Sequence, residues 1–374
     1  MKVEINARPL GWGYAGVSTY LTNLIAQLRG SYSDLELRFA TDKVFEALPS
    51  KCQSVVSPRI RDLKTQVLWE SISFPMHTIS TKPDVVHTPY HTATAWSRGC
   101  RVLTVHDCFL WDNRPSDQSQ RLYRSMLELS VKRAHAILTV SEYSRNRIVE
   151  TFHIDPRWIF VSPLAASGDL SVPRSFAQIE DFRKRTGIGI DRPYILYAGG
   201  TARHKGILSL IEAYGRLDPD LRACTDLLLV GGLAHGNTHH DEIRDAIAEL
   251  QPPGKIIAAG ALSQSDLGTA YQAATVFVFP SSYEGFGLSP LEAMQCGVPV
   301  VVSNRTSIPE VVGDAALLID PDDSLSISCA ITSVLASHER RRNMRAASLA
   351  RASTFSWART AERTVAAYTA ALER

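Results

Sequence analysis

Short apolar runs alternate with amphipathic segments along most of the chain, and this pattern predicts the fold class. In the first half we expect strands at residues 2–6, 35–40, 85–87, 102–105 and 136–140, and helices at 17–29, 63–71, 118–133 and 142–152. Strands that alternate with helices form parallel, doubly wound α/β sheets. The first half therefore predicts one Rossmann-like domain.

The same alternation resumes further along the chain. We expect strands at 194–198, 227–231, 256–259, 276–279, 300–303 and 316–319, and helices at 207–216, 240–250, 265–273, 290–296 and 356–372. The stretch between the two alternations is richer in Ser, Pro and Gly. We therefore predict an N-terminal domain at 1–164, a linker at 165–192, a second Rossmann-like domain at 193–354 and a terminal helical segment at 355–374.

The stretch 281–294 joins an apolar strand to a helix and carries two glutamates eight residues apart. Glu284 lies in a glycine-broken loop, and Glu292 lies in the first turn of a helix that Ser289 can cap and Pro290 can open. Free backbone N–H groups and the helix dipole favour a phosphate at such a helix start. The pattern indicates a site for a nucleotide diphosphate attached to a hydroxyl-rich group, such as a nucleotide-sugar.

Glu292 also fits a purely structural interpretation. Ser289 and Glu292 have the spacing of a capping box, in which the glutamate bonds back to the backbone N–H of the capping residue. The spacing alone leaves both interpretations open.

The residues that follow carry a family resemblance. The two glutamates precede the sequences Cys296-Gly297-Val298-Pro299-Val300-Val301-Val302-Ser303-Asn304 and Pro309-Glu310-Val311-Val312-Gly313-Asp314-Ala315-Ala316. This region resembles the C-terminal domain of glycosyltransferase family 4, and within it the mannosyltransferase-like branch that builds bacterial surface polysaccharides. The resemblance implies the GT-B fold, in which two Rossmann-like domains face each other across a cleft and a terminal helix crosses back to the N-terminal domain.

A basic loop follows the first strand of the second domain. An Arg can form a bidentate hydrogen bond to two phosphate oxygens, and a Lys acts as a point charge, so Arg203 and Lys205 suit a diphosphate. The structural alternative is a solvated basic loop. The family places basic residues here, and the resemblance therefore implies that both bind the donor diphosphate.

His106 and Asp107 end a strand of the first domain. A His at a strand end can bond a sugar hydroxyl, although a lone His is more often structural. The resemblance to the family's His–Asp pair implies that His106 is catalytic and that Asp107 orients the loop. Ser141 either lines the donor site or caps the helix that begins near residue 142.

Residues 11–16 match the dinucleotide fingerprint Gly-x-Gly-x-x-Gly, which lies after a strand and before a helix. We do not interpret them as that fingerprint, because the loop after Asn6 is longer than its tight turn and contains Trp12. The resemblance implies instead a Gly-rich loop in which Gly13 and Gly16 lie near the donor.

The resemblance also supplies the reaction. It implies retaining hexosyl transfer from a nucleotide-diphosphate sugar, with GDP-mannose favoured, to a saccharide acceptor that is lipid-linked. Glu284 would face the donor sugar, and Glu292 would accept bonds from the ribose hydroxyls. Arg203 and Lys205 would stabilise the leaving diphosphate. The remaining donor contacts are Leu262, near the base, and the N–H groups of Gly287, Leu288 and Ser289.

Two Asp-Pro-Asp sequences imitate the Asp-x-Asp metal motif of other glycosyltransferases. They are Asp218-Pro219-Asp220 and Asp320-Pro321-Asp322. Because Asp-Pro pairs are common turn formers, we predict turns at both places. We expect no metal and no cofactor besides the donor substrate.

The composition of the 374 residues suits a globular protein of two domains. Residues 1–164 hold 20 Lys and Arg against 15 Asp and Glu. This excess suits anionic lipid or a phosphate-bearing acceptor, and equally an ordinary solvated surface. Six cysteines without metal spacing, a charged N-terminus and the lack of a long apolar run predict a cytoplasmic protein. We expect peripheral contact with the inner face of the plasma membrane at most, and no nucleic-acid partner.

Three other functions stay open from the sequence. They are a glycosyltransferase that uses a UDP-sugar, a GT-B-fold sugar-nucleotide epimerase, which needs no acceptor, and an NAD-binding Rossmann protein suggested by residues 11–16. Binding of GDP, UDP or NAD would separate them, because a ligand raises the apparent stability of the protein that binds it.

Overall fold

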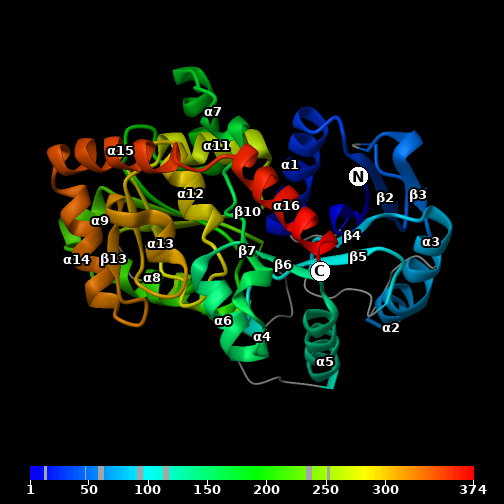
Figure 1. The fold of residues 1–374 in the computed structure, drawn as a ribbon. Coiled ribbons are helices and arrows are strands. Elements are labelled where there is room, and N and C mark those ends of the chain that lie inside the picture. The colour runs from blue at the N-terminus through cyan, green and yellow to red at the C-terminus, as the bar shows by residue number, and fades with distance from the viewer. Residues whose placement is uncertain are drawn as a thin grey trace. The chain divides into compact units, whose positions relative to one another are not determined.

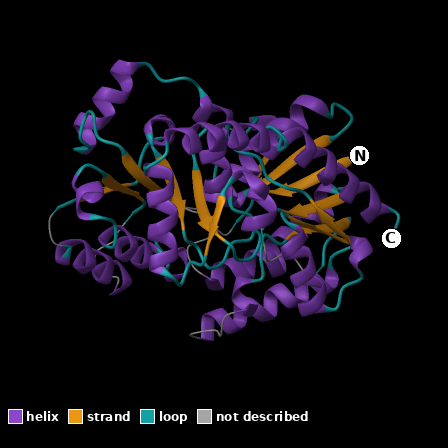
Figure 2. Cartoon of the chain, turned by 90° about the vertical axis from the view of Figure 1, so that its left-hand side faces the viewer, coloured by secondary structure: helices purple, strands orange, loops and turns teal. Residues whose placement is uncertain are grey.

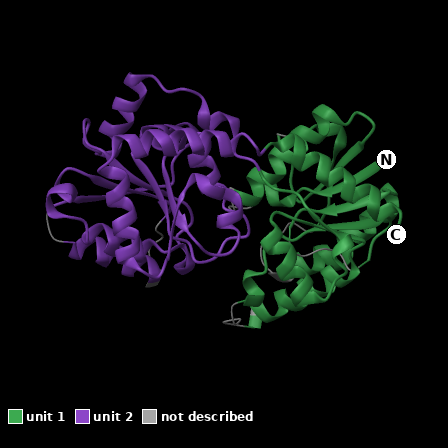
Figure 3. Cartoon of the chain, turned by 60° about the vertical axis from the view of Figure 1, so that its left-hand side comes forward, with its two compact units in different colours: residues 1–164, 356–374 green, residues 165–355 purple. Residues whose placement is uncertain are grey.

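The computed structural model describes residues 1–11, 15–46, 48–57, 63–90, 96–112, 118–232, 238–250 and 253–374. Within it the chain divides into two compact units, which Figure 3 shows in different colours. Unit 1 comprises Met1–Leu164 and Ser356–Arg374, and unit 2 comprises Ala165–Phe355.

Unit 1 is built on a seven-stranded parallel sheet with the order β3-β2-β1-β4-β5-β6-β7 (Figure 1). The strands are β1 Lys2–Asn6, β2 Glu36–Thr41, β3 Gln53–Val55, β4 Val85–Thr88, β5 Cys100–Thr104, β6 Ala136–Thr139 and β7 Ile159–Val161. Every residue of β4 and β6 is buried. Strands covered on both faces carry few polar residues, which is why they are recognisable in the sequence as short apolar runs.

Helices cover both faces of this sheet. They are α1 Ala15–Ser31, α2 Leu63–Leu68, α3 Phe74–Thr81, α4 Phe109–Asp112, α5 Gln118–Arg133, α6 Glu142–Phe152 and α16 Trp357–Leu372, with a π-helical turn at Trp69–Ser73. Successive strand residues point to opposite faces. Leu103 therefore packs in the apolar cluster with α5 and α6, whereas the next residue, Thr104, bonds the Tyr20 hydroxyl of α1.

Unit 2 contains a six-stranded parallel sheet with the order β10-β9-β8-β11-β12-β13. Its strands are β8 Tyr194–Ala198, β9 Asp226–Val230, β10 Lys255–Gly260, β11 Val276–Phe279, β12 Val300–Ser303 and β13 Leu317–Ile319. Figure 2 shows helices on both faces of the strands. They are α7 Phe176–Thr186, α8 Ile207–Gly215, α9 Pro219–Ala223, α10 Thr238–Glu249, α11 Gln264–Ala273, α12 Leu288–Gln295, α13 Ile308–Val312, α14 Ser324–Leu335 and α15 His338–Ala352.

The two parallel sheets confirm the predicted doubly wound α/β class. Each predicted strand is present, with ends that shift by at most two residues. The hydrophobic pattern missed β3 and β7, which have three residues each; β3 also contains the polar Gln53 and Ser54. The predicted helix at 63–71 is the start of a longer segment, in which α2, the π-helical turn and α3 follow one another up to Thr81.

The stretch 165–192, which the sequence suggests is a linker, belongs to unit 2. Its helix α7 starts with a capping box formed by Ser175 and Gln178 and ends at Gly187, whose φ of 79° is left-handed. The Arg185 guanidinium reaches Asp266 of α11, with 2.8 Å between the nitrogen and the oxygen. The ion pair with α11 joins the segment to the rest of unit 2.

The C-terminal helix α16 packs on unit 1 beside α1 and over β5 and β6. Ser162 donates a hydrogen bond to the Thr360 carbonyl at 3.0 Å, and the Thr360 hydroxyl donates to the Pro163 carbonyl at 2.6 Å. The end of the chain is thereby joined to β7 of the first sheet. Among the described residues, no helix has both the length and the apolar character needed to cross a membrane.

Candidate functional site

The strand order of unit 2 identifies where a ligand is expected. The chain runs outward from β8 through β9 to β10, returns to β11 on the other side of β8, and continues to β12 and β13. In doubly wound sheets, ligands bind outside the carboxyl ends of the strands where this order reverses. The loops after β8 and β11 therefore border the expected binding position.

These two loops bring Lys205 and Glu284 together. The Lys205 ammonium lies 2.6 Å from a Glu284 carboxylate oxygen, and the two side chains are 19% and 14% exposed. The turn that carries Lys205 ends at Gly206, where φ is 71° and a Cβ atom would lie 2.1 Å from the Pro280 carbonyl oxygen. Only glycine fits this approach of the two loops.

The loop that carries Glu284 is held by its neighbours. The Ser282 N–H donates to the His204 carbonyl at 2.8 Å, which ties the loop to the turn of Lys205. From the loop after β12, the Thr306 hydroxyl accepts the Glu284 N–H at 3.0 Å, and the Ser307 hydroxyl donates to the Glu284 carbonyl at 2.9 Å. The backbone of Glu284 is thus fixed on both sides.

Arg203 has a different partner from Lys205. Its guanidinium lies 2.6 Å from the Glu242 carboxylate of α10, and its side chain is 64% exposed. Hydrogen bonding to Glu242 raises the pKa of Arg203 above its ordinary value. The structure therefore places Lys205 with Glu284 and places Arg203 with α10, and the diphosphate role of Arg203 stays a prediction.

Helix α12 begins two residues before the predicted position. Its first residue is Leu288, and Gly287 occupies the capping position with φ at 107°. Within the described part of the chain, no side chain caps this helix start. The capping-box interpretation of Ser289 and Glu292 is therefore wrong: a left-handed glycine starts the helix before Ser289, and Glu292 lies beyond the first turn.

Glu292 instead accepts a hydrogen bond from the Tyr271 hydroxyl of α11, at 3.0 Å. Ser289 also hydrogen-bonds Tyr271. Burial raises the pKa of the Glu292 carboxyl to about 7, against the opposing effect of the Tyr271 bond. No sequence pattern pointed to Tyr271, because the contact joins two helices whose packing is set by the sheet.

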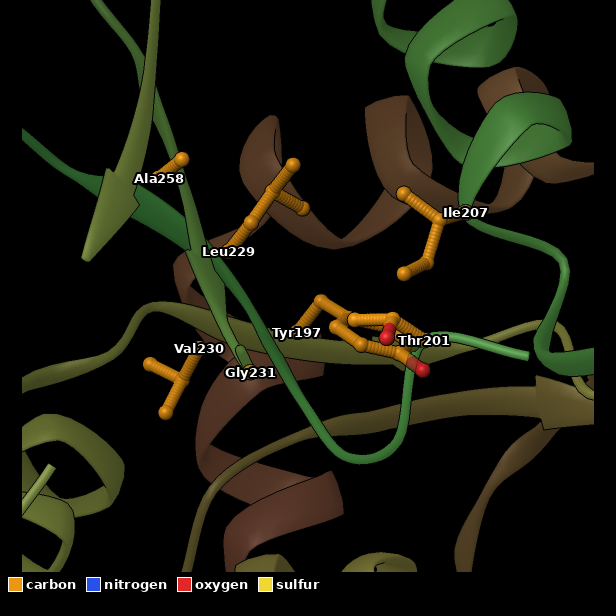
Figure 4. Close-up of a pocket in the computed structure, with 7 residues that line it drawn as sticks. All are labelled: Tyr197, Thr201, Ile207, Leu229, Val230, Gly231 and Ala258. Atoms are coloured by element: carbon orange, nitrogen blue, oxygen red, sulfur yellow. The ribbon is translucent and has the colours of Figure 1, made fainter. Parts of the chain in front are cut away.

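Leu262 lies in the loop after β10, the edge strand of the sheet, directly before Ser263, which caps α11. A small, mainly apolar pocket lies at the ends of β8, β9 and β10 (Figure 4). It is lined by Tyr197, Thr201, Ile207, Leu229, Val230, Gly231 and Ala258. Thr201 and Ile207 flank the turn of Lys205, and the Thr201 hydroxyl lies 2.7 Å from a ring nitrogen of His240.

In unit 1, His106 follows β5 directly after the buried Val105. Its Nε2 lies 3.1 Å from the Pro89 carbonyl oxygen in the loop after β4, and the Tyr20 ring meets it edge-on with ring centres 5.1 Å apart. The Asp107 carboxylate accepts the Phe109 N–H at 2.9 Å. Asp107 therefore orients the loop, as the sequence suggested.

Ser141 is buried, and its hydroxyl accepts the Ser144 N–H at 3.0 Å at the start of α6. Of the two interpretations left open for Ser141, capping is the one that the structure displays. Gly16 lies in the first turn of α1, where a Cβ atom would meet no atom of a described residue within 4 Å. Gly13 lies outside the described residues.

A buried polar chain underlies His106. The Tyr368 hydroxyl of α16 lies 2.7 Å from His87 Nδ1, and His87 Nε2 lies 2.9 Å from the Thr104 hydroxyl. The Thr104 hydroxyl lies 3.2 Å from the Tyr20 hydroxyl. Burial and, to a lesser extent, the charge of His106 lower the pKa of His87 to about 3. His87 is therefore neutral, and the chain joins α16 to the residue that packs on His106.

Of the two Asp-Pro-Asp sequences, the second forms a turn, as predicted, whereas the first begins helix α9. Asp218 caps α9 by accepting the N–H groups of Asp220 and Leu221. Asp320 accepts the Asp322 N–H at 3.1 Å and pairs with Arg305. Among the described residues, no group of three or more His, Cys, Asp or Glu side chains is arranged to hold a metal ion.

Family models match both units. Residues 14–165 match the model for Glycosyltransferase Family 4, and residues 178–351 match the model for glycosyl transferases group 1. The two matches together span the sites described above in both units.

Individual proteins extend this result. The chain is 37% identical to O-antigen chain mannosyltransferase B from Escherichia coli over 270 residues, which are 71% of this chain and 69% of that protein. It is 28% identical to alpha-maltose-1-phosphate synthase from Mycolicibacterium smegmatis, with 95% of each chain covered.

A solved structure shares the fold. Sucrose-phosphate synthase from Thermosynechococcus elongatus superposes with a TM-score of 0.79 at 19% identity, over 99% of this chain and 98% of that one. The two doubly wound units are those of the GT-B fold, and the chain belongs to glycosyltransferase family 4.

Proposed function

We propose that this glycosyltransferase moves a mannosyl group from GDP-mannose to a lipid-linked saccharide acceptor, with retention at the anomeric carbon and without a metal ion. One observation carries the proposal: the partly exposed Lys205–Glu284 pair lies where the strand order reverses, and Glu284 lies in the loop that leads to the start of α12. The choice of mannose is supported by the name of the Escherichia coli relative, an O-antigen chain mannosyltransferase.

Lys205 is proposed to exchange its partner when the donor binds. Its ammonium leaves the Glu284 carboxylate for the diphosphate, which frees Glu284 to accept a bond from a hydroxyl of the donor sugar. The first N–H groups of a helix have no partner inside the helix, so those of Leu288 and Ser289, with that of Gly287, complete the anion site. These fixed charges and dipoles stabilise the leaving group as its negative charge grows.

Glu292 is proposed to hold the ribose. Its carboxylate already accepts from the Tyr271 hydroxyl through one oxygen, and an ionised carboxylate has further acceptor positions for two ribose hydroxyls. Leu262 is proposed to lie near the base. Arg203 joins the diphosphate only after it releases Glu242, which its exposed position permits.

The transfer breaks the bond between the anomeric carbon and the diphosphate oxygen and forms one to the acceptor oxygen on the same face. The acceptor proton passes to the leaving phosphate oxygen, and GDP is released. Glu284 and His106 are proposed to bond sugar hydroxyls while positive charge develops on the ring. Gly13 and Gly16 are proposed to allow close approach of the Gly-rich loop to the substrates.

The test is a transfer assay with the purified protein, GDP-mannose and a lipid-linked oligosaccharide acceptor, followed by assignment of the product anomer by NMR. We expect an α-mannoside and GDP. Transfer from UDP-glucose but not from GDP-mannose would replace the donor and keep the reaction. Isomerisation of the nucleotide-sugar without an acceptor would instead make the protein an epimerase.

A further inference from the structure

The outer side of the α2–α3 segment is apolar. Four large aliphatic side chains on it are 42–55% exposed: Leu68, Ile72, Met76 and Ile79. They are spaced by four, four and three residues, so they follow one side of the helical segment. The opposite side is buried in unit 1 through Trp69, Glu70, Phe74 and Thr78. We call the four exposed aliphatic residues the apolar stripe; α2 and α3 are labelled in Figure 1.

The stripe carries no charge of its own. Between Thr65 and Thr81 the sequence has one charged residue, Glu70, and its carboxylate is buried 3.1 Å from the Arg8 guanidinium. Exposed helix faces of soluble domains are normally polar and charged, and contiguous exposed apolar patches mark sites of interaction. Trp96, which is 43% exposed, adds an aromatic ring, because its indole N–H donates to the Ser71 carbonyl at 3.0 Å.

Cations gather at the C-terminal end of the stripe. Lys82 is exposed and ends α3 in the left-handed conformation, with φ at 47°. The Arg98 N–H donates to the Thr78 hydroxyl at 3.0 Å, and the Lys2 ammonium bonds the Thr81 carbonyl. The neighbouring acid, Asp84, accepts the backbone N–H of Lys2 at 2.7 Å. Three basic residues thus lie beside the last turn of α3, Arg98 through its backbone.

We infer that the apolar stripe and Trp96 rest on the surface of an anionic phospholipid bilayer, with Lys2, Lys82 and Arg98 against the lipid phosphates. Aliphatic side chains on one side, a Trp beside them and basic residues at the border are the composition of helices that lie in the membrane interface. The charge complementarity favours anionic lipid, because the stripe itself carries no charge and the charged side chains placed against the phosphates are all basic. The inference rests on the proposed function only in that a lipid-linked acceptor would place the enzyme at a membrane.

The test is co-sedimentation of the full chain with vesicles of phosphatidylcholine, alone or mixed with phosphatidylglycerol. We expect binding to the anionic vesicles, which weakens as salt is raised because exposed charges are screened. The variant with Ile72→Ser, Met76→Ser and Ile79→Ser should bind at least about tenfold more weakly, since insertion scales with the buried apolar area. Lys82→Ser with Arg98→Ser should lower the binding and its salt dependence together.

The matched control removes three exposed apolar side chains from unit 2. Val172→Ser, Phe176→Ser and Leu325→Ser change residues that are 50%, 76% and 59% exposed, and this variant should bind vesicles as the wild type does. Unchanged vesicle binding by the stripe variant overturns the inference. The inference is also overturned if the stripe joins two copies of the chain. Gel filtration of wild type and variant would show such a dimer.

Activity separates this inference from the proposed function. The stripe variant should transfer sugar to a water-soluble saccharide at the wild-type rate but lose transfer to a lipid-linked acceptor in vesicles. If the wild type uses neither acceptor while the stripe variant still loses vesicle binding, the proposed function is wrong. The inference that the apolar stripe binds a membrane is then retained.

Discussion

Each unit places a cation after its first strand and pairs it with a glutamate, but the two pairs differ in burial. Arg8 follows β1, lies 3.1 Å from Glu70, and neither side chain is more than 3% exposed. Lys205 follows β8, lies 2.6 Å from Glu284, and both side chains keep contact with solvent. A cation that stays accessible can exchange its carboxylate for a phosphate, whereas a fully buried one is committed to the fold.

The surroundings of the two pairs reinforce this difference. Arg8 stacks over the buried Trp69 ring at 4.4 Å and also bonds the Asn6 side chain. Burial lowers the pKa of Arg8 to about 10, with Glu70 acting against that shift, so Arg8 stays charged at neutral pH. The Lys205 ammonium lies 5.8 Å from the centre of the Phe279 ring, and its side chain is partly exposed. Burial commits the first pair to the fold, and donor binding is the role that we propose for the second.

The largest expected effect is on the stability of unit 1. Glu70→Gln removes the carboxylate that is hydrogen-bonded to the buried Arg8 and leaves only the weaker effect of Asp42. We expect a loss of about 3–5 kcal/mol in the free energy of unfolding, measured by urea denaturation. Glu284→Gln is the matched control and should cost under about 1 kcal/mol, because Lys205 can be solvated. Equal losses for the two variants would remove the contrast between the pairs.

The second effect is on catalysis. Lys205→Met should lower kcat/KM for the nucleotide-sugar by on the order of 10²–10³, as for loss of one electrostatic group at a transition state. Binding of the nucleoside without phosphates should not change, and the melting temperature should shift little. Arg203→Met should have a smaller effect, since Arg203 pairs with Glu242. If both variants lose the same activity, the proposed division between the two cations is wrong.

A third effect concerns Glu292. Glu292→Gln should weaken donor binding by on the order of tenfold, or about 1.4 kcal/mol, because a neutral amide offers one acceptor and a mismatched donor to the ribose. Isothermal titration calorimetry measures the change. A 2′,3′-dideoxy nucleotide should bind wild type and variant equally. If the variant keeps the wild-type preference for the ribose over the dideoxy nucleotide, the assignment is wrong.

The pH dependence of Glu292 has a definite sign. Its pKa is raised in the folded protein from 4.5 to about 7, so the folded state favours the protonated form. Stability from this group is fully present below about pH 4.5 and is lost as the pH rises through 7. The melting temperature of Glu292→Gln should therefore rise relative to wild type between pH 5 and 8, while donor affinity of the wild type increases with ionisation.

A smaller effect is expected from the buried polar chain of unit 1. Tyr368→Phe removes the hydroxyl that bonds His87 and should cost about 0.5–1.5 kcal/mol of stability. We also expect kcat to fall by roughly two- to fivefold, or about 0.4–1 kcal/mol, because Tyr20 at the far end of the chain packs on His106. Tyr194→Phe removes a buried hydroxyl of unit 2 that bonds the Ala270 carbonyl. That control should lose similar stability and no activity.

The smallest expected effect is that of chelation. The proposed positive field comes from Lys205 and the start of α12, so EDTA should leave the transfer rate unchanged. Complete loss of activity with EDTA, restored by manganese, would falsify the metal-free proposal and would return attention to Asp320 and Asp322.

Much of the fold was predictable because burial leaves a local pattern. The strands β8, β11 and β12 are buried at every position, so they stand out as apolar runs between helical periods. The loops after them carry Lys205 and Glu284, whose charges are visible in the sequence. Their pairing across 79 residues was not visible, because it depends on β8 and β11 lying side by side.

Two local predictions could be decided only from the backbone conformation. Gly287 starts α12 with a left-handed φ, and hydrophobic periodicity carries no information on φ, so the sequence favoured Ser289 as the cap. Arg203 and Lys205 are equivalent as residues of a basic loop. In a 3₁₀ turn of three residues per turn, positions two apart point in different directions, and the two cations reach different carboxylates.

The sequence by itself determined the parallel α/β class, most strand positions and the kinds of charged residue that follow each strand, because these depend on neighbours within a few residues. Tertiary structure decided which charges meet and how much water reaches them. Arg8 and Lys205 each follow the first strand of their unit. The π-helical turn covers Arg8 with Trp69 and Glu70, while the loops after β8 and β11 leave Lys205 open, since burial is a property of the packed elements and not of the residue.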